Sequence, residues 1–273
     1  SGHLCRPFNH KILDVALLRL RFCSIRNDKS GPNPCVKLGI SVYSDSLNPT
    51  ITGGKMQINE KILVSDFDGT MTEFDFFRVA LSRLPPLAAA PWERYEQGQT
   101  SHFDALAEIF SGLRVDEQEF DAMLAEMRTE SGLVEAIDRL RQAGWPLVIA
   151  SAGCAFYIKR ILLKSGIKAV IHANPGDFIP GQGLFMIPPH RSPFFTAETG
   201  IDKSAVVRYY LDHGFAAAFA GDGRPDLAPA MLVSPERRFA RGWLAEELEN
   251  RREPFVRFDR WRDIADCLCG GAP

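Results

Sequence analysis

The 273-residue sequence lacks an apolar run of the roughly 20 residues that a membrane-spanning helix needs. The longest approach to one, residues 12–20, is interrupted by Asp14 and Arg19, and the same interruption argues against a secretory signal. An excess of charge of one sign is also missing: the net charge is -2, so no basic field would attract nucleic acid or anionic lipid. We therefore expect neither a membrane nor a nucleic acid as partner, and a cytoplasmic location.

The 6 cysteines form no C-x-x-C pair and have no histidine at the spacing of a zinc site. This excludes a zinc knuckle and a dithiol redox motif, and reduced thiols are the default expectation. Hydrophobic residues at 45% and charged residues at 24% are typical of soluble globular proteins, so the chain can build a full core.

The first 55 residues differ in composition from the rest of the chain. They contain eight Lys and Arg, three Asp and no Glu, and residues 30–52 are dense in Gly, Pro, Asn and Ser without sustained periodicity. We interpret residues 1–55 as a poorly structured extension. The alternative is a small subdomain or an edge strand over residues 36–42. The folded unit is expected to begin at Met56.

From Lys61 onward, apolar runs of strand length alternate with segments of helical periodicity, which is typical of an α/β fold with a parallel sheet. Strands are predicted at residues 62–65, 146–151, 169–173, 216–220 and 238–240. Helices are predicted at residues 134–143, 155–164, 203–213 and 240–250.

Residues 72–128 are too many for one crossover between strands. They carry apolar residues at helical spacing over residues 75–83, 102–111 and 117–127. We expect residues 75–128 to form an inserted helical cap, with residues 56–74 and 129–273 forming the core domain.

The sharpest local signal is the sequence ILVSDFDGTMT at residues 62–72, in which two aspartates follow a buried strand. Ligands of open α/β sheets bind beyond the carboxyl ends of the strands, so Asp66 and Asp68 should project into that crevice, while Phe67 points away. A carboxylate there can attack phosphorus and form an aspartyl-phosphate, and a second can protonate the leaving oxygen. The alternatives are a surface turn and a calcium loop; the latter fails because Gly69 stands at the fourth loop position rather than the sixth.

A second strand runs into glycines and acids at residues 218–226, AFAGDGRPD. Bringing Asp222 and Asp226 close to Asp66 concentrates negative charge that a hard divalent cation would neutralise, and Mg²⁺ prefers such carboxylate oxygens. Taken alone, this motif could also be a turn with a capped helix.

Two further elements complete a phosphate site. Ser151 directly follows an apolar run, and Ala152 and Gly153 are expected to open the next helix, so that the hydroxyl and nearby N–H groups face a phosphoryl oxygen. Lys203, at the start of a later helix, can offset charge between the nucleophile and the phosphate. Alone, each is weak, since a serine N-cap and a solvated lysine are both common.

The four motifs, in this order, resemble those of the haloacid dehalogenase superfamily, whose phosphatases carry D-x-D-x-T, Ser or Thr, Lys and G-D-x-x-x-D. The resemblance implies a Rossmann-like parallel sheet with an inserted helical cap of the C1 type. It also implies the following roles: Asp66 as nucleophile, Asp68 as acid and base, Ser151 and Lys203 on phosphate, and Mg²⁺ held by Asp66, the Asp68 backbone carbonyl and Asp222, with support from Asp226.

Within the superfamily the pattern is most similar to phosphoserine phosphatase-like members, above all to the methionine-salvage phosphatases of 2-hydroxy-3-keto-5-methylthiopentenyl 1-phosphate. The shared features include TEFD at residues 72–75 and the tail at residues 239–258. Phosphoserine phosphatases have a Glu where this chain has Asp75, a candidate substrate-binding residue, and a cap Arg. Residues 102–113 contain no arginine, which leaves Arg94 and Arg114 as the next candidates.

We therefore expect a small phosphorylated metabolite as substrate. The cap offers apolar residues that either line a pocket or hold the cap helices together: Phe103, Leu106, Ile109, Phe110, Met123 and Met127. Residues 190–192 are either a solvated loop or a substrate contact. Pro225 stands where relatives usually carry a polar residue.

Three other functions are weighed: a phosphoserine phosphatase, a phospho-accepting receiver module and a non-catalytic binding protein. A receiver module has no cap and holds its acceptor Asp alone at a strand end. The binding protein is disfavoured because no catalytic position is lost. The sequence does not indicate an oligomeric state.

Overall fold

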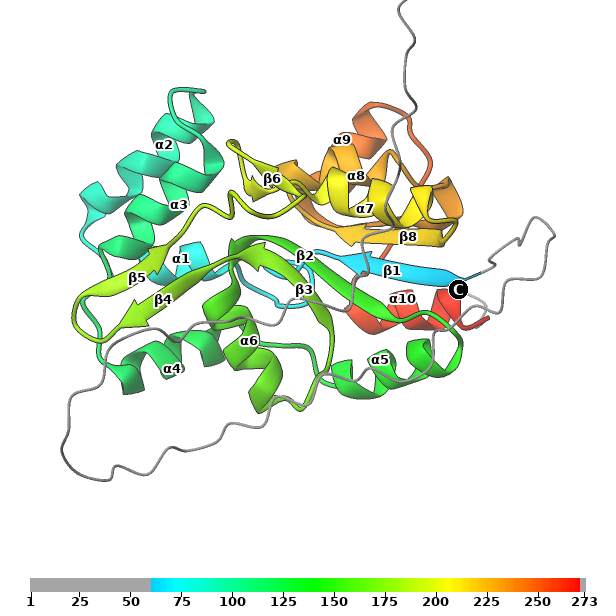
Figure 1. Ribbon diagram of the computed structural model, residues 1–273, viewed down its shortest axis with the longest axis horizontal. Coiled ribbons are helices and arrows are strands. Elements are labelled where there is room, and N and C mark those ends of the chain that lie inside the picture. The colour runs from blue at the N-terminus through cyan, green and yellow to red at the C-terminus, as the bar shows by residue number, and fades with distance from the viewer. Residues whose placement is uncertain (1–59, 271–273) are drawn as a thin grey trace, which may run out of the picture. The chain divides into compact units, whose positions relative to one another are not determined.

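The structure is a computed structural model that describes residues 60–270. A six-stranded sheet runs through it in the order β10-β9-β8-β1-β2-β3, and all five neighbouring pairs are parallel (Figure 1). Its strands are β1 (Lys61–Ser65), β2 (Leu147–Cys154), β3 (Val170–Asn174), β8 (Ala216–Gly221), β9 (Arg238–Ala240) and β10 (Val256–Arg257). The parallel α/β architecture expected from the alternating pattern is confirmed.

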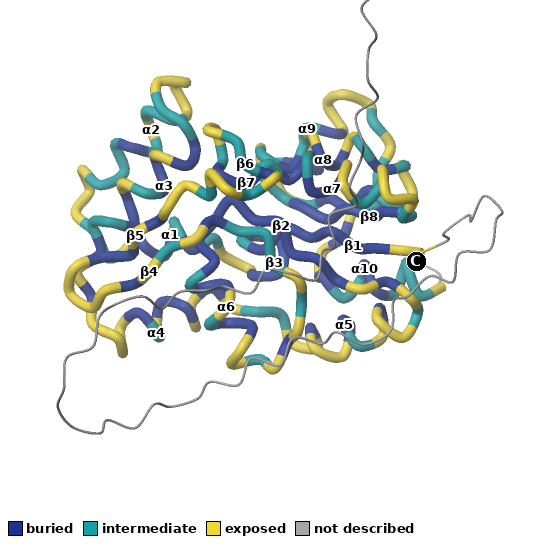
Figure 2. The backbone as a smooth tube through the Cα atoms, in the orientation of Figure 1, coloured by how far each residue is buried: buried dark blue, intermediate teal, exposed yellow. Residues whose placement is uncertain are grey.

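Helices cover both faces of this sheet, which explains why its central strands are buried (Figure 2). Leu63 packs into one hydrophobic cluster and the next residue, Val64, into the other, because successive strand residues point to opposite faces. One layer contains α5 (Leu133–Gln142), α6 (Ala155–Lys164) and α10 (Trp261–Leu268). The other contains α7 (Lys203–Asp212), α8 (Leu227–Ala230) and α9 (Gly242–Asn250).

The segment between β1 and β2 is helical. It comprises α1 (Phe76–Leu81), the 3-10 helix η1 (Pro86–Ala89), α2 (Ala90–Glu96), α3 (His102–Ser111) and α4 (Glu117–Glu126). A hairpin of β4 (Gly176–Ile179) and β5 (Gly183–Met186) packs beside these helices, with β5 against α3. The cap helices and α6 share one hydrophobic cluster, in which Phe76 stacks on Tyr157 with ring centroids 4.4 Å apart. The division into a core and a separate cap domain stays a prediction.

The remaining elements are short. They are β6 (Phe195–Thr196), β7 (Gly200–Ile201) and the 3-10 helices η2 (Arg224–Asp226) and η3 (Pro235–Arg237). Within residues 60–270, no helix combines the length and apolar character needed to traverse a bilayer. The possible strand at residues 36–42 and the proposed extension over residues 1–55 lie outside the described residues.

Two local expectations are wrong. Residues 152 and 153 do not open a helix, because β2 continues to Cys154 and α6 begins at Ala155. The extended backbone is supported by the Asn174 side chain of β3, whose Nδ2 donates to the Ala152 carbonyl at 2.7 Å. The helix expected from residue 240 begins at Gly242 instead, because β9 extends to Ala240.

Candidate active site

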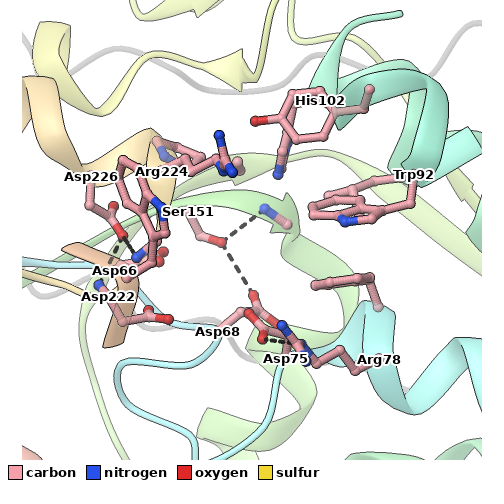
Figure 3. Close-up of a pocket in the computed structure, with 18 of the residues that line it drawn as sticks. Asp66, Asp68, Asp75, Arg78, Trp92, His102, Ser151, Asp222, Arg224 and Asp226 are labelled. Atoms are coloured by element: carbon pink, nitrogen blue, oxygen red, sulfur yellow. Dashed lines mark hydrogen bonds and ion pairs between the residues drawn. The ribbon is translucent and has the colours of Figure 1, made fainter. Parts of the chain in front are cut away.

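The candidate site lies at the carboxyl edge of the sheet, where three parallel strands end side by side. Asp66 follows β1, Ser151 lies near the end of β2 and Asp222 follows β8. Because parallel strands end at one edge, residues 156 positions apart in sequence line a single cavity of about 420 Å³ (Figure 3). The described structure thus brings together every residue that the four motifs singled out.

Lys203 links two of the acids. Its Nζ lies 2.8 Å from Asp66 Oδ1 and 2.6 Å from Asp226 Oδ1, and its side chain is only 4% exposed. Burial alone lowers the pKa of Lys203, but the two carboxylates raise it by more, so its pKa stays above the usual value. The two carboxylates therefore favour the charged form of Lys203 and hold its ammonium group beside Asp66.

Three carboxylates crowd around this ammonium. Oxygens of Asp66, Asp222 and Asp226 lie within 4.8 Å of one another. Burial, followed by repulsion from Asp226, raises the pKa of Asp66 well above its usual value and that of Asp222 to about 7. Clustered carboxylate oxygens whose mutual repulsion Lys203 offsets only in part are suitable ligands for Mg²⁺. The Asp68 side chain is not part of this group, so only its backbone carbonyl stays a predicted ligand.

Asp226 also shapes the loop after β8. Its Oδ2 accepts hydrogen bonds from the backbone N–H groups of Asp222 at 3.0 Å and Gly223 at 2.8 Å. A Cβ added at Gly221 would lie 2.6 Å from the Asp226 side chain, so the close approach requires glycine. Asp226, fully buried, positions Asp222 as well as Lys203.

Asp68 has contacts of a different kind. Its Oδ1 accepts the Phe76 N–H at 3.0 Å, and its Oδ2 accepts the Tyr157 hydroxyl at 2.7 Å and lies 3.5 Å from Ser151 Oγ. Burial raises the pKa of Asp68 to about 6, and the Tyr157 hydrogen bond counteracts part of that rise. A carboxyl group with a pKa near neutrality can both release and accept a proton. Phe67, between the two aspartates, is fully buried in the core.

Gly153 is required where β2 meets α6. A Cβ there would lie 1.9 Å from Tyr157 Oη and 2.8 Å from Asp68 Oδ2. Its backbone N–H donates to Ser151 Oγ at 2.9 Å, which fixes that hydroxyl in the cavity. Ala152 lines the cavity beside them. The absence of a side chain at position 153 leaves room for the Tyr157–Asp68 contact.

Arg241, which precedes α9, holds the loop that follows the two aspartates. Its guanidinium donates to the Gly69 carbonyl, with Nε at 2.7 Å, and to the Thr72 carbonyl at 2.7 Å. Gly69 has φ +70°, and a Cβ there would lie 2.4 Å from Asp222 Oδ2. The loop after β1 is therefore packed tightly against the acid of β8.

Aromatic and apolar side chains of the cap form the wall that faces the acids. Phe77 of α1 stacks on Trp92 of α2 with ring centroids 4.1 Å apart, and Tyr95 and His102 pack around that indole. Leu106 and Phe110 of α3, two of the six apolar cap residues considered above, also line the cavity. The other four are buried in the core instead: Phe103, Ile109, Met123 and Met127.

Charged residues of the cap and of η2 line the cavity near its exposed side. Asp75 lines it and forms an ion pair of 3.3 Å with Arg78, whose side chain is 71% exposed. Burial raises the pKa of Asp75, and Arg78 opposes that rise. Glu96 and Arg224 are exposed too, and Arg224 lies over the Trp243 ring at 5.2 Å. The buried part of the cap wall is uncharged.

Comparison with known proteins agrees with this geometry. Residues 63–231 match the family model of the haloacid dehalogenase-like hydrolases. The chain belongs to this family. A curated 2-hydroxy-3-keto-5-methylthiopentenyl-1-phosphate phosphatase of Brevibacillus brevis is 29% identical over 214 residues, which cover 76% of this chain and 94% of that protein.

Two solved structures share the haloacid dehalogenase fold of this hydrolase. A family member from Salmonella enterica has a TM-score of 0.60 at 15% identity and covers 80% of this chain and 75% of its own. The phosphoserine phosphatase of T. onnurineus has a TM-score of 0.55 at 18% identity and covers 80% of this chain and 99% of its own. The predicted fold and superfamily are confirmed, and a hydrolase family excludes the receiver module.

Sequence reasoning about cations in this hydrolase was wrong in two places. Arg94 pairs with Glu108 at 2.6 Å, and Arg114 donates to the carbonyls of Ser111, Leu113 and Gln182, so neither lines the cavity. The cations at its rim, Arg78 and Arg224, were missed. Residues 190–192 line a different hollow, together with residues of β3.

Three of the aromatic residues at the cavity, Trp92, Tyr95 and Tyr157, were also missed. Two of them lie on α2, a helix that was not predicted, and the third looks like an ordinary core residue of an amphipathic helix. The signal that could have found α2 is Pro91, because proline is favoured in the first turn of a helix.

Proposed function

We propose that this haloacid dehalogenase-like phosphatase is a Mg²⁺-dependent phosphomonoester hydrolase that acts on a small phosphorylated metabolite through an aspartyl-phosphate. The observation that carries the proposal is the arrangement of two buried carboxylates with different partners. Asp66 lies against the Lys203 ammonium at 2.8 Å, whereas Asp68 is held by Tyr157 and Phe76. Lys203 counteracts the rise in the pKa of Asp66 and so favours its ionised form, whereas Asp68, with a pKa raised to about 6, is suited to carry a proton. The phosphatase named among the relatives supports the same chemistry.

The first half-reaction uses Asp66 as nucleophile. Lys203 binds Oδ1 and favours the ionised form of Asp66, and Oδ2 attacks phosphorus. The new oxygen–phosphorus bond forms as the bond between phosphorus and the leaving oxygen breaks, and Asp68 gives its proton to that oxygen. The products are an acyl phosphate on Asp66, the free alcohol and an ionised Asp68. The Ser151 hydroxyl lies where it can donate to a phosphoryl oxygen.

The second half-reaction reverses the role of Asp68. Its carboxylate takes a proton from a water molecule, whose oxygen attacks phosphorus and displaces Asp66. The bond between Asp66 and phosphorus breaks, inorganic phosphate leaves, and both carboxyl groups return to their first state. The Tyr157 hydrogen bond favours the ionised form of Asp68, which this step requires.

The residues that would hold Mg²⁺ are Asp66, Asp222 and the backbone carbonyl of Asp68, supported by Asp226, whose two oxygens already bind Lys203 and the N–H groups of Asp222 and Gly223. Bound there, Mg²⁺ offsets the charge of the carboxylates and of the phosphoryl group. Thr70 donates a hydrogen bond of 2.6 Å to Asp222 Oδ1, which lowers the pKa of that carboxyl and favours its ionised, metal-binding form.

The cap wall supports a substrate with an uncharged, partly apolar carbon chain. Trp92, Leu106 and Phe110 line the cavity opposite the acids, and a charged group placed against them without a partner would be costly to desolvate. The compound in the names of the curated relatives, 2-hydroxy-3-keto-5-methylthiopentenyl 1-phosphate, has such a chain. The second candidate is O-phosphoserine, which is favoured by the rim pair of Asp75 and Arg78.

A substrate panel tests the reaction. The protein should hydrolyse phosphomonoesters with Mg²⁺ and lose activity in EDTA, and Asp66→Asn should lower kcat by about 10⁴-fold or more because the amide is not a nucleophile. The control is Asp212→Asn, which removes an exposed acid at the end of α7 and should leave kcat unchanged. A kcat of Asp66→Asn within tenfold of the parent value would refute the role of Asp66 as the nucleophile.

Substrate choice is tested on the same protein. We expect kcat/KM to be at least tenfold higher for the methylthiopentenyl enol-phosphate than for O-phosphoserine. A higher kcat/KM for O-phosphoserine would indicate that Arg78 or Arg224 binds the serine carboxylate. It would refute the proposal that the substrate has an uncharged carbon chain.

A further inference from the structure

A buried histidine in the cap wall has no hydrogen-bond partner for its ring among the described residues. His102, the first residue of α3, is 8% exposed, and its Nδ1 is buried without a hydrogen-bond partner among residues 60–270. No described residue hydrogen-bonds to its Nε2 either. Buried polar side chains nearly always have a partner, so a histidine that pairs neither ring nitrogen with a described residue requires an explanation.

The environment of the ring keeps it neutral. His102 packs edge-on against Trp92 and Tyr95, with ring centroids 5.6 Å and 5.1 Å apart. Burial, followed by the charge of Lys203, lowers the pKa of His102 to about 4. A neutral imidazole offers one N–H donor and one acceptor nitrogen.

The ring is placed to meet a ligand in the cavity. His102 lines the same cavity as Asp66 and Asp68, and in Figure 3 it lies with Trp92 on the cap side, across the cavity from Asp68. Because Nδ1 is fully buried, Nε2 is the nitrogen that a ligand can reach. A buried N–H without an acceptor is tolerated less well than a buried lone pair, so the proton belongs on Nε2.

We propose that His102 Nε2–H donates a hydrogen bond to a hydroxyl or keto oxygen on the leaving group, and so selects phosphate esters whose otherwise apolar chain carries such an oxygen. The proposal rests on the proposed phosphatase function and specifies its substrate class. A role in packing alone would be served better by phenylalanine, which fills the same space with no unpaired nitrogen. The presence of a polar imidazole at this wall of the cavity therefore indicates a hydrogen bond to the substrate.

Two probes that differ in one oxygen test this assignment: pentyl phosphate and 2-oxopentyl phosphate. Comparing their kcat/KM values within one protein cancels any general loss of activity. The variants are His102→Phe, which keeps a ring, and His102→Gln, which keeps a donor. The matched control is His172→Phe: His172 is a half-buried histidine that packs edge-on against Phe194, 4.8 Å between centroids, and lies outside the cavity.

We expect His102→Phe to lower the preference for 2-oxopentyl phosphate over pentyl phosphate by tenfold or more. His102→Gln should restore part of that preference, and His172→Phe should keep it within twofold of the parent. The Tm of His102→Phe should equal or exceed that of the parent. Should that variant fail to fold, His102→Met removes both nitrogens and gives the same comparison.

A preference unchanged in His102→Phe or His102→Met would overturn the assignment and leave the phosphatase function intact. If the parent protein shows no Asp66-dependent turnover of either probe, this would instead refute the proposed function, and the assignment of His102 with it.

Discussion

Removing the Tyr157 hydroxyl should impair catalysis through Asp68 while leaving the protein folded. In the structure this hydroxyl donates to Asp68 Oδ2 at 2.7 Å, and the side chain is buried in the core beside Phe76. Tyr157→Phe keeps the ring and its stacking. The variant therefore removes one hydrogen bond to a carboxylate and little else, which makes Tyr157 a positioning residue that can be tested.

The size of the effect follows from the charge of the acceptor. A hydrogen bond to a charged group contributes about 1.5–3 kcal/mol. If Asp68 depends on it in the transition state, kcat falls between roughly 10-fold and 100-fold. The loss should be larger for alkyl phosphates than for p-nitrophenyl phosphate, because nitrophenolate leaves without needing a proton from Asp68.

Steady-state assays of both substrates measure this contrast, and circular dichroism checks the fold. Tyr210→Phe is the matched control: Tyr210 lies on α7 outside the cavity and packs edge-on against Phe215, with ring centroids 5.4 Å apart. Equal rates for Tyr157→Phe and the parent on both substrates would show that the hydroxyl does not act through Asp68, whereas the same loss on both would place its action in the second half-reaction, which the two substrates share.

Three other outcomes follow from the same geometry. Asp68→Asn should retain more activity on p-nitrophenyl phosphate than on alkyl phosphates, and equal losses in steady-state assays would count against Asp68 as the acid. Lys203→Met leaves Asp66 and Asp226 buried without their cation, so urea unfolding should show a loss of about 3–5 kcal/mol, and an unchanged midpoint would contradict the buried ion pairs. Deleting residues 1–55 should preserve folding and kcat, because all four motifs follow Met56; an insoluble or inactive fragment would show that the extension packs on the core.

The chemistry of the site could be predicted from sequence because it depends on local signals. A buried strand followed by acids places Asp66 and Asp222 at the same sheet edge in any parallel arrangement, whatever the details of packing. Ser151 follows from the same rule, whereas Lys203 was found as a cation at the start of a helix, α7. The strands that carry these residues were predicted to within three residues of their observed ends.

The cap wall could not be predicted, because its contacts are tertiary. Tyr157 reaches Asp68 only through the packing of α6 and the missing side chain at Gly153, and neither is visible in hydrophobic periodicity. Helix α2 follows a run of alanines that carries little periodic signal, and the proline in its first turn went unused. The β4–β5 hairpin did have a signal, the Pro180-Gly181 dipeptide between two apolar stretches, which went unused.

The cap contacts Asp68, the proposed proton carrier, directly, so the elements that enclose the substrate also position the general acid. Phe76 begins α1, its N–H donates to Asp68 Oδ1, and its ring stacks on Tyr157, which holds Asp68 Oδ2. Both oxygens of Asp68 are thus fixed by groups that move with α1 or pack against it. A shift of α1 away from α6 would break the Phe76 N–H bond to Asp68 and the stacking of Phe76 on Tyr157. The position of the general acid is therefore set by the same helices that enclose the leaving group.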